Sequence, residues 1–249
     1  MKKHIPNAIT LANLFCGCIA VIFIVENYFV YGVFFAFLGV FFDFFDGFFA
    51  RKFNVQSDLG LQLDSLADMV TSGLVPGVIM FKLLGLADTS WGREVDVNLL
   101  IHPFLDVTGA SLLPFLGLFI TLASAYRLAK FNIDTEQQSF FKGLPTPANT
   151  LLIASLPLIV EFQKSDVINA IIFNTWFLIA LTIVSCYILN SNIKLFALKF
   201  KTYNFKDNSV RYIFIILAIV LLVLLQFSAI PVIIILYLIL SFINNLITK

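Results

Sequence analysis

From residue 43 the chain reads Asp43-Phe-Phe-Asp46-Gly47-Phe-Phe-Ala50-Arg51 and, after eight further residues, Gly60-Leu-Gln-Leu-Asp64-Ser-Leu-Ala-Asp68. Five of the 15 acidic residues of the chain lie in these 26 positions, within strongly apolar sequence. Asp43 and Asp46 are three residues apart and Asp64 and Asp68 are four apart, so each pair shares one face of a helix. Because carboxylates are costly in hydrocarbon, such a set at membrane depth indicates a functional site.

The composition is that of an integral membrane protein. Of 249 residues, 60% are hydrophobic and 12% charged, and the mean hydropathy is +0.96. A soluble domain is roughly half apolar and about a quarter charged. The net charge of +1 gives no sign of a nucleic-acid partner, and we expect none. The N-terminus leads into the first apolar segment without a convincing cleavage site, so we expect it to be retained.

The apolar segments predict an all-α, polytopic membrane helix bundle. A spanning helix needs roughly 20 apolar residues, which gives six to eight spans, with eight favoured. The uncertain ones are the fourth, the fifth and the last pair. The eight spans are expected at about 9–25, 28–50, 60–85, 107–128, 147–160, 167–189, 212–227 and 230–247. We divide the chain into a membrane domain at 1–190 and, at 191–249, a basic stretch with two further helices.

The distribution of Lys and Arg predicts the orientation. With eight spans, all of the 16 Lys and Arg residues except Lys82, Arg93 and Lys164 fall on one side. Basic residues favour the cytoplasmic side of a membrane. We therefore expect a protein of the cell membrane, with both termini and the acidic segments at the cytoplasmic face.

The short connection between Arg51 and Gly60 makes the two acidic helices antiparallel neighbours, so their four carboxylates can converge. Such groups repel one another unless cations neutralise them. Oxygen-only ligands favour hard ions such as Mg²⁺ or Mn²⁺, with Ca²⁺ as an option. No His or Cys lies between residues 43 and 68 to suit zinc. Four carboxylates suit a centre of two metal ions, which typically serves phosphoryl transfer.

Two other interpretations of the acidic residues stay open at this point. Carboxylates in membrane helices also form proton or cation relays in transporters. A purely structural role would pair them with Arg51 and Lys52, but two bases leave excess negative charge. On the helix of Asp43, Gly47 and Ala50 continue the acidic face, which would let a bulky ligand approach the backbone.

The spacing of Asp, Gly, Ala and Arg in this stretch is similar to that of the CDP-alcohol phosphatidyltransferases. All eight fixed positions of that family's motif are present, from Asp43 to Asp68. Within the family, further segments resemble bacterial and archaeal enzymes that use serine as the acceptor. These are Pro6-Asn7-Ala8-Ile9-Thr10-Leu-Ala-Asn13-Leu-Phe-Cys-Gly17, Asp64 to Pro76, Arg127-Leu-Ala-Lys130-Phe131-Asn132 and Phe141-Lys142-Gly143-Leu144-Pro145-Thr146-Pro147. The resemblance covers about residues 5–150.

The resemblance implies transfer of a phosphatidyl group from CDP-diacylglycerol to L-serine, with a homodimer as a possible assembly. It implies that Asp43, Asp46, Asp64 and Asp68 hold metal and that Asp68 is also the general base. The residues implied to contact CDP-diacylglycerol are Asn7, Thr10, Gly47, Ala50, Arg51, Ser57 and Gly60. A family member more usually has Arg where this chain has Lys130, which keeps the charge and loses the bidentate fork.

Serine needs a cation for its carboxylate and an acceptor for its ammonium group. Arg127 and Lys142 are candidates for the first task, and Asn132 can serve either group. These basic residues can instead anchor helices at lipid headgroups. The alternatives for the whole protein are a sister transferase using glycerol 3-phosphate or inositol, and a cation- or proton-coupled transporter. In the reaction itself, direct attack by serine is favoured over a phosphatidyl-enzyme intermediate formed on a carboxylate.

Overall fold

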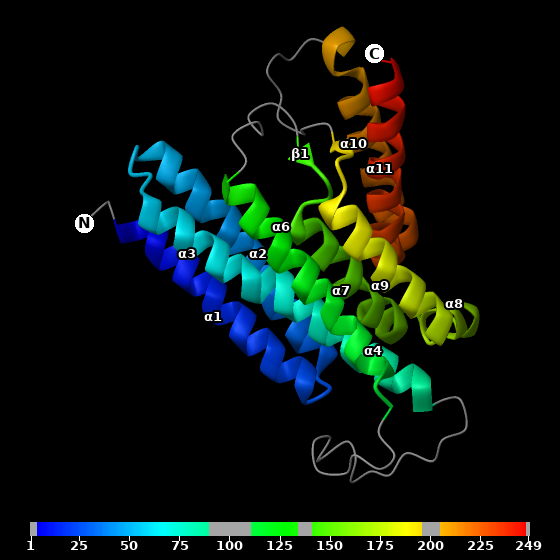
Figure 1. Cartoon of the computed structure of the whole chain (residues 1–249). Helices are drawn as coiled ribbons and strands as arrows, with labels where there is room; N and C mark the ends of the chain where they lie inside the picture. The colour runs from blue at the N-terminus through cyan, green and yellow to red at the C-terminus, as the bar shows by residue number, and fades with distance from the viewer. Residues whose placement is uncertain (1–3, 90–110, 134–140, 196–204, 248–249) are drawn as a thin grey trace.

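The computed structural model of the chain describes residues 4–89, 111–133, 141–195 and 205–247 (Figure 1). Its α-helices are α1 (Ile5–Val25), α2 (Phe29–Lys52), α3 (Asp58–Asp68), α4 (Val75–Thr89), α6 (Phe119–Ile133), α7 (Thr146–Gln163), α8 (Asp166–Ile172), α9 (Thr175–Asn190), α10 (Phe205–Leu225) and α11 (Ala229–Ile247). Two 3₁₀ segments, Leu113–Leu118 and Gln226–Ser228, precede α6 and α11. Two-residue strands, β1 (Phe141–Lys142) and β2 (Lys194–Leu195), pair antiparallel. The predicted all-α class is confirmed.

Within the described residues, four segments are long and apolar enough to cross a membrane, and the protein is therefore an integral membrane protein. They are 5–25, 29–52, 58–88 and 210–243, of which the last includes both α10 and α11. The pair α8 and α9, bent by 60°, adds a fifth if it is one span. Helix covers most of each of the eight predicted spans where the structure describes it, but a 60° bend at residues 173–174 breaks the sixth into α8 and α9; residues 107–110 of the fourth lie outside the described ranges. The 15-residue α6 is short for a crossing on its own.

The apolar core lies at one end of the bundle and leaves the other end for polar groups. It contains Ala20 and Ile24 from the second half of α1, Val33 and Ala36 from the first half of α2, and Ile79 from α4, with further residues of α6, α7 and α9. The short turn after Val25 makes α1 and α2 antiparallel. The acidic residues therefore lie at the end of α2 that is far from this core.

A π-helical segment joins α3 to α4 directly after Asp68 and spans Met69–Leu74. The wider turn frees backbone carbonyls for neighbouring helices. Thr150 of α7 donates to the carbonyl of Ser72 over 3.0 Å, and Thr121 of α6 donates to that of Gly73 over 3.1 Å. The sequence predicted one helix here, and the π-helical segment was not foreseen.

The helices α10 and α11 form a hairpin whose members run side by side (Figure 1). The rings of Phe214 and Tyr237 are 5.6 Å apart between centroids. Ile234 of α11 packs with Leu195 of β2 and Leu144, which ties the hairpin to the segment before α7. Half of the predicted basic stretch at 194–211, residues 196–204, lies outside the described ranges. The division of the chain at residue 190 stays a prediction.

Candidate active site

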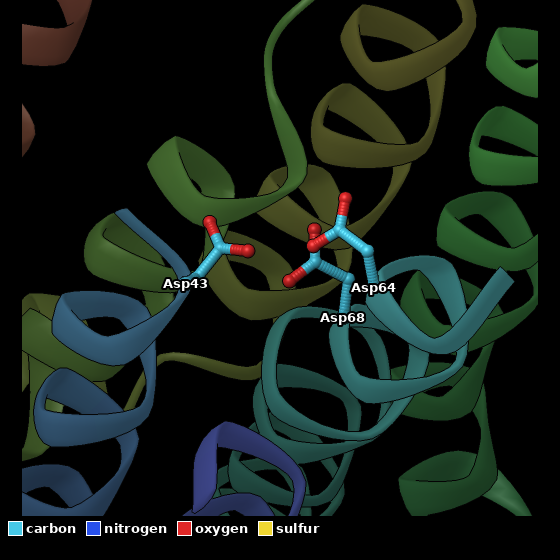
Figure 2. Close-up of side chains that lie close together, drawn as sticks. All are labelled: Asp43, Asp64 and Asp68. Carbon is cyan, nitrogen blue, oxygen red and sulfur yellow. The ribbon is translucent and has the colours of Figure 1, made fainter. Parts of the chain in front are cut away.

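Three carboxylates from α2 and α3 face one another. Figure 2 shows Asp43 on α2 pointing toward Asp64 and Asp68 on α3. One oxygen from each of the three lies within 4.8 Å of the others. The helices meet because α2 ends at Lys52 and α3 begins at Asp58, which makes the connection shorter than the sequence indicated. Asn54 closes this turn in the left-handed region, with φ of 53°.

Asp46 lies one turn further along α2 and has a different environment. Its side chain is 5% exposed and accepts a hydrogen bond from the Thr10 hydroxyl over 2.5 Å. It still interacts electrostatically with the other three carboxylates. The structure thus brings together three of the four predicted metal ligands and places the fourth beside them, against α1.

The donor set fits a hard divalent cation. Within the described residues the cluster of Asp43, Asp64 and Asp68 contains oxygen ligands and no His or Cys. All three side chains are partly buried, so water screens their repulsion only in part. Three carboxylates of this kind, with Asp46 next to them, have the chemistry that Mg²⁺ and Mn²⁺ prefer.

A pocket of about 430 Å³ adjoins the carboxylates at the ends of α1, α2 and α3. It is lined by both Asp46 and Asp64, which connects it to the acidic cluster. All seven residues predicted to contact CDP-diacylglycerol line this one pocket, together with Pro6, Val55, Gln56, Asp58 and Leu61: they are Asn7, Thr10, Gly47, Ala50, Arg51, Ser57 and Gly60.

The pocket is lined by a positively charged side chain and by small residues. The Arg51 guanidinium lies over Gly47, where an added Cβ would be 3.5 Å from its Nη1 atom. Ser57 caps α3 by accepting from the Gly60 N–H over 3.1 Å. A Cβ on Gly60 would approach Asn7 Oδ1 to 3.3 Å. The N-terminus of α3, which carries partial positive charge, therefore opens onto the pocket where α1 comes closest.

The predicted serine-binding residues do not form one group. Arg127 is 7% exposed and donates from Nε to the carbonyl of Leu144 over 2.5 Å and from Nη2 to that of Gly143 over 3.4 Å. It also interacts electrostatically with Asp68. Lys142 lines a small recess with Arg127. Asn132 lies apart from that recess.

Asn132 instead bonds α3, because its Nδ2 donates to the Ser65 hydroxyl over 2.8 Å. Ser65 directly follows Asp64, so this bond fixes α6 against the acidic helix. The structure therefore brings Arg127 and Lys142 together and gives Asn132 a contact between helices.

Sequence reasoning treated Thr10 as a substrate contact and did not foresee its bond to Asp46. It also missed Asn13, which is completely buried one turn further along α1 and interacts with Asp68. The sequence does contain a pattern that points to the buried face of α1. Along that face, polar and small residues recur at helical spacing, namely Pro6, Thr10, Asn13 and Gly17.

Comparison with known proteins gives consistent matches. The family model described as CDP-alcohol phosphatidyltransferase matches residues 3–188, which ends before α10. The chain is 32% identical over 169 residues to CDP-diacylglycerol–serine O-phosphatidyltransferase of Bacillus subtilis, covering 68% of this chain and 81% of that protein. The yeast protein of the same name from Saccharomyces cerevisiae is 28% identical, with 64% of this chain and 55% of that protein covered. Archaetidylserine synthase of Methanothermobacter thermautotrophicus is 25% identical, with 62% and 58% covered.

Proposed function

Because the chain belongs to the CDP-alcohol phosphatidyltransferase family, we propose that it transfers the phosphatidyl group of CDP-diacylglycerol to L-serine, giving phosphatidylserine and CMP. The observation that carries this proposal is the junction of two features at one end of the bundle. The three facing carboxylates adjoin a pocket lined by all seven residues expected to contact CDP-diacylglycerol. The names of the Bacillus and yeast relatives support serine as the acceptor.

The pocket residues bind and orient the nucleotide end of the lipid. Arg51 supplies a guanidinium for phosphate oxygens, and the first turn of α3 supplies backbone N–H groups. Gly47 and Gly60 keep the backbone accessible, while Asn7 and Thr10 present polar groups from α1. The diacyl chains remain in the bilayer, since the pocket lies at helix ends.

We assign the metal site to Asp43, Asp64 and Asp68 with Asp46 beside them, and propose two divalent ions, Mg²⁺ or Mn²⁺. When bound, they would offset negative charge on the pyrophosphate and on the departing phosphate. The donor chemistry of the cluster supports this assignment, and so does its proximity to the pocket in which the pyrophosphate is expected.

Asp68 accepts the proton of the serine hydroxyl as that oxygen attacks the phosphorus attached to diacylglycerol. The new bond joins the serine oxygen to phosphorus, and the bond from phosphorus to the CMP oxygen breaks. CMP leaves with that electron pair. A covalent phosphatidyl-enzyme is disfavoured because a carboxylate committed to metal is a weak nucleophile.

Arg127 and Lys142 are proposed to receive the serine carboxylate. Arg127 also holds the segment before α7 through the carbonyls of Gly143 and Leu144. Arg127→Ala is therefore expected to raise the serine KM and to lower the melting temperature, and Lys142→Ala is expected to raise the serine KM. Steady-state kinetics and thermal unfolding of both variants check this. An unchanged serine KM in both would remove them from the acceptor pocket.

One assay tests the acceptor. Purified protein receives CDP-diacylglycerol, Mn²⁺ or Mg²⁺, and in parallel L-serine, glycerol 3-phosphate or inositol, and CMP release is measured. CMP release that depends on serine is expected. Release with glycerol 3-phosphate or inositol alone would assign a sister reaction. Absence of CMP with every acceptor would instead favour the transporter interpretation.

We further propose that the active site and both termini face the cytoplasm, where serine and CDP-lipid are available. The excess of Lys and Arg on the side of the acidic helix ends supports this orientation. A homodimer also stays a prediction, which the mass of the detergent-solubilised protein tests.

A further inference from the structure

Asn13 is a fully buried polar residue whose side-chain amide makes no hydrogen bond that would account for its burial. Its exposed fraction is 0%, and neither amide atom makes a hydrogen bond of normal geometry. Its backbone carbonyl accepts a hydrogen bond from the Thr71 hydroxyl over 3.2 Å. Buried polar groups are almost always hydrogen-bonded, so an amide left without a bond indicates a function.

The surroundings of this amide leave Asp68 as its natural partner. The Asn13 side chain interacts with the Asp68 carboxylate, and Asp68 Oδ1 is itself buried without a hydrogen bond. On its other side the Asn13 amide packs closely against α2. A Cβ on Gly39 would lie 3.0 Å from Asn13 Oδ1 and 2.6 Å from Thr71 Cγ2. An ionised carboxylate can only accept, so the amide nitrogen is the group that can pair with it.

On the preceding turn of α1, an equivalent pair of polar side chain and carboxylate is joined by a hydrogen bond. Thr10 lies three residues before Asn13 on the same buried face and donates to Asp46 over 2.5 Å. Two successive turns of α1 thus each present a polar side chain to a carboxylate. Thr10 is presented to Asp46 beside the pocket, and Asn13 is presented to Asp68 on α3. Groups that bond a ligating or reacting carboxylate from behind fix its orientation.

We propose that Asn13 is the positioning residue of Asp68: its Nδ2 donates to one carboxylate oxygen and directs the other toward Asp43 and Asp64. This inference rests on the proposed transferase reaction, in which Asp68 accepts the serine proton. Asn13 touches no reacting atom and acts through Asp68. It holds the carboxylate in the rotamer that serves the acidic cluster.

The test uses full-length protein with Asn13→Leu, which has similar size and no donor, and Asn13→Ser, which retains a shorter donor. Asn13→Leu is expected to lower kcat ten- to a hundredfold while the KM for CDP-diacylglycerol stays within twofold. Its melting temperature is expected to be unchanged or higher, because an apolar side chain replaces an unbonded buried amide. Asn13→Ser is expected to recover part of kcat.

The control is Thr182→Val, which removes a buried hydroxyl in α9. That hydroxyl donates to the Leu178 carbonyl over 2.8 Å. The control variant should leave kcat unchanged. A kcat of Asn13→Leu within twofold of wild type would overturn the proposal. So would a loss of kcat that tracks a lower melting temperature, or one shared equally by Thr182→Val.

A second readout does not depend on the reaction. If Asn13 directs Asp68 into the cluster, Mn²⁺ alone should raise the melting temperature of wild-type protein more than that of Asn13→Leu or Asn13→Ser. Equal shifts in all three proteins would overturn the positioning role. Wild-type protein that responds to Mn²⁺ but releases no CMP with serine would refute the proposed function while this comparison still decides the role of Asn13.

Discussion

Asp46 and Asp68 show how single contacts give similar carboxylates different tasks. Asp46 is bonded by Thr10 and borders the pocket, whereas Asp68 faces Asp43 and Asp64 and interacts with Asn13 and Arg127. The first environment suits a group that holds charge in place beside the nucleotide. The second suits a group that must accept a proton within the acidic cluster.

Replacing Asp68 tests the catalytic role directly. Asp68→Asn keeps the size of the side chain but removes the base and one anionic ligand, so turnover is expected to fall at least about a hundredfold. The fold should persist, because the substitution relieves repulsion among the carboxylates. The measurement is CMP release alongside thermal unfolding, with Asp166→Asn, exposed at the start of α8, as the control. A folded Asp68→Asn variant with near-normal CMP release would exclude Asp68 as the base.

Thr10 can be tested by removing its hydroxyl. Thr10→Val leaves the buried Asp46 carboxylate without its bond, and a hydrogen bond to a charged group contributes about 1.5–3 kcal/mol. We expect a lower melting temperature and a higher KM for CDP-diacylglycerol, both restored by Thr10→Ser. If Thr10→Val and Thr10→Ser behave alike in both measurements, the hydroxyl has no role at Asp46.

Among the elements, α1, α2 and the π-helical segment must approach closely for the site to form. Gly17 and Gly39 allow this approach, because a Cβ at either would meet Thr71 at 2.5–2.6 Å. Thr71 lies in the segment that follows Asp68, so the spacing of these helices sets the position of the carboxylate. The site therefore depends on the close approach of α1 and α2 to the Thr71 side chain.

Gly39→Ala is expected to force α2 away from Thr71 and to destabilise the protein by about 1–3 kcal/mol, as overpacking does. The matched control is Gly85→Ala in α4, whose Cβ would meet only Pro114 at 3.8 Å, an ordinary contact. That control should be neutral or stabilising, since Ala favours helix over Gly. Thermal unfolding in detergent compares the two. Equal melting temperatures would show that the helices do not need this close approach.

The sequence predicted the helices well where an apolar run ends at a charge or a turn, as at Val25 and Lys52. It could not predict the π-helical segment, because the same side chains fit an α-helix and the difference is imposed by bonds from α6 and α7. The acidic spacing predicted the cluster, since neighbouring helices bring such faces together. The sequence does not indicate the contacts of Arg127 and Asn132. Arg127 bonds a distant loop, and Asn132 bonds Ser65.

At the scale of the whole molecule, the apolar core and the acidic site occupy different ends of one bundle. Under the proposed function, we expect the lipid substrate to reach the acidic site from the bilayer and serine to reach it from water. The α10–α11 hairpin lies beyond the residues that the family model matches, and its contacts with the rest include the packing of Ile234 against Leu144 and Leu195. We expect it to support the segment before α7 without contributing catalytic groups.

The proposed orientation predicts where fused reporters work. A fluorescent protein fused after residue 249 should fold and fluoresce in cells, because the C-terminus is expected in the cytoplasm. Alkaline phosphatase fused at the same position should be inactive, since it requires the opposite compartment. The reverse pattern would place the acidic helix ends on the outer side.

Under the proposed function, the phosphatidyl group passes to serine at the cluster of Asp43, Asp64 and Asp68. The most direct measurement follows labelled serine into lipid and CMP into solution, with purified protein, CDP-diacylglycerol and Mn²⁺. Equal amounts of phosphatidylserine and CMP are expected. Both should be lost with a chelator, restored by added metal and absent in a folded Asp43→Asn variant. Serine incorporation that persists in the chelator or in Asp43→Asn would exclude the acidic cluster as the metal-dependent catalytic centre.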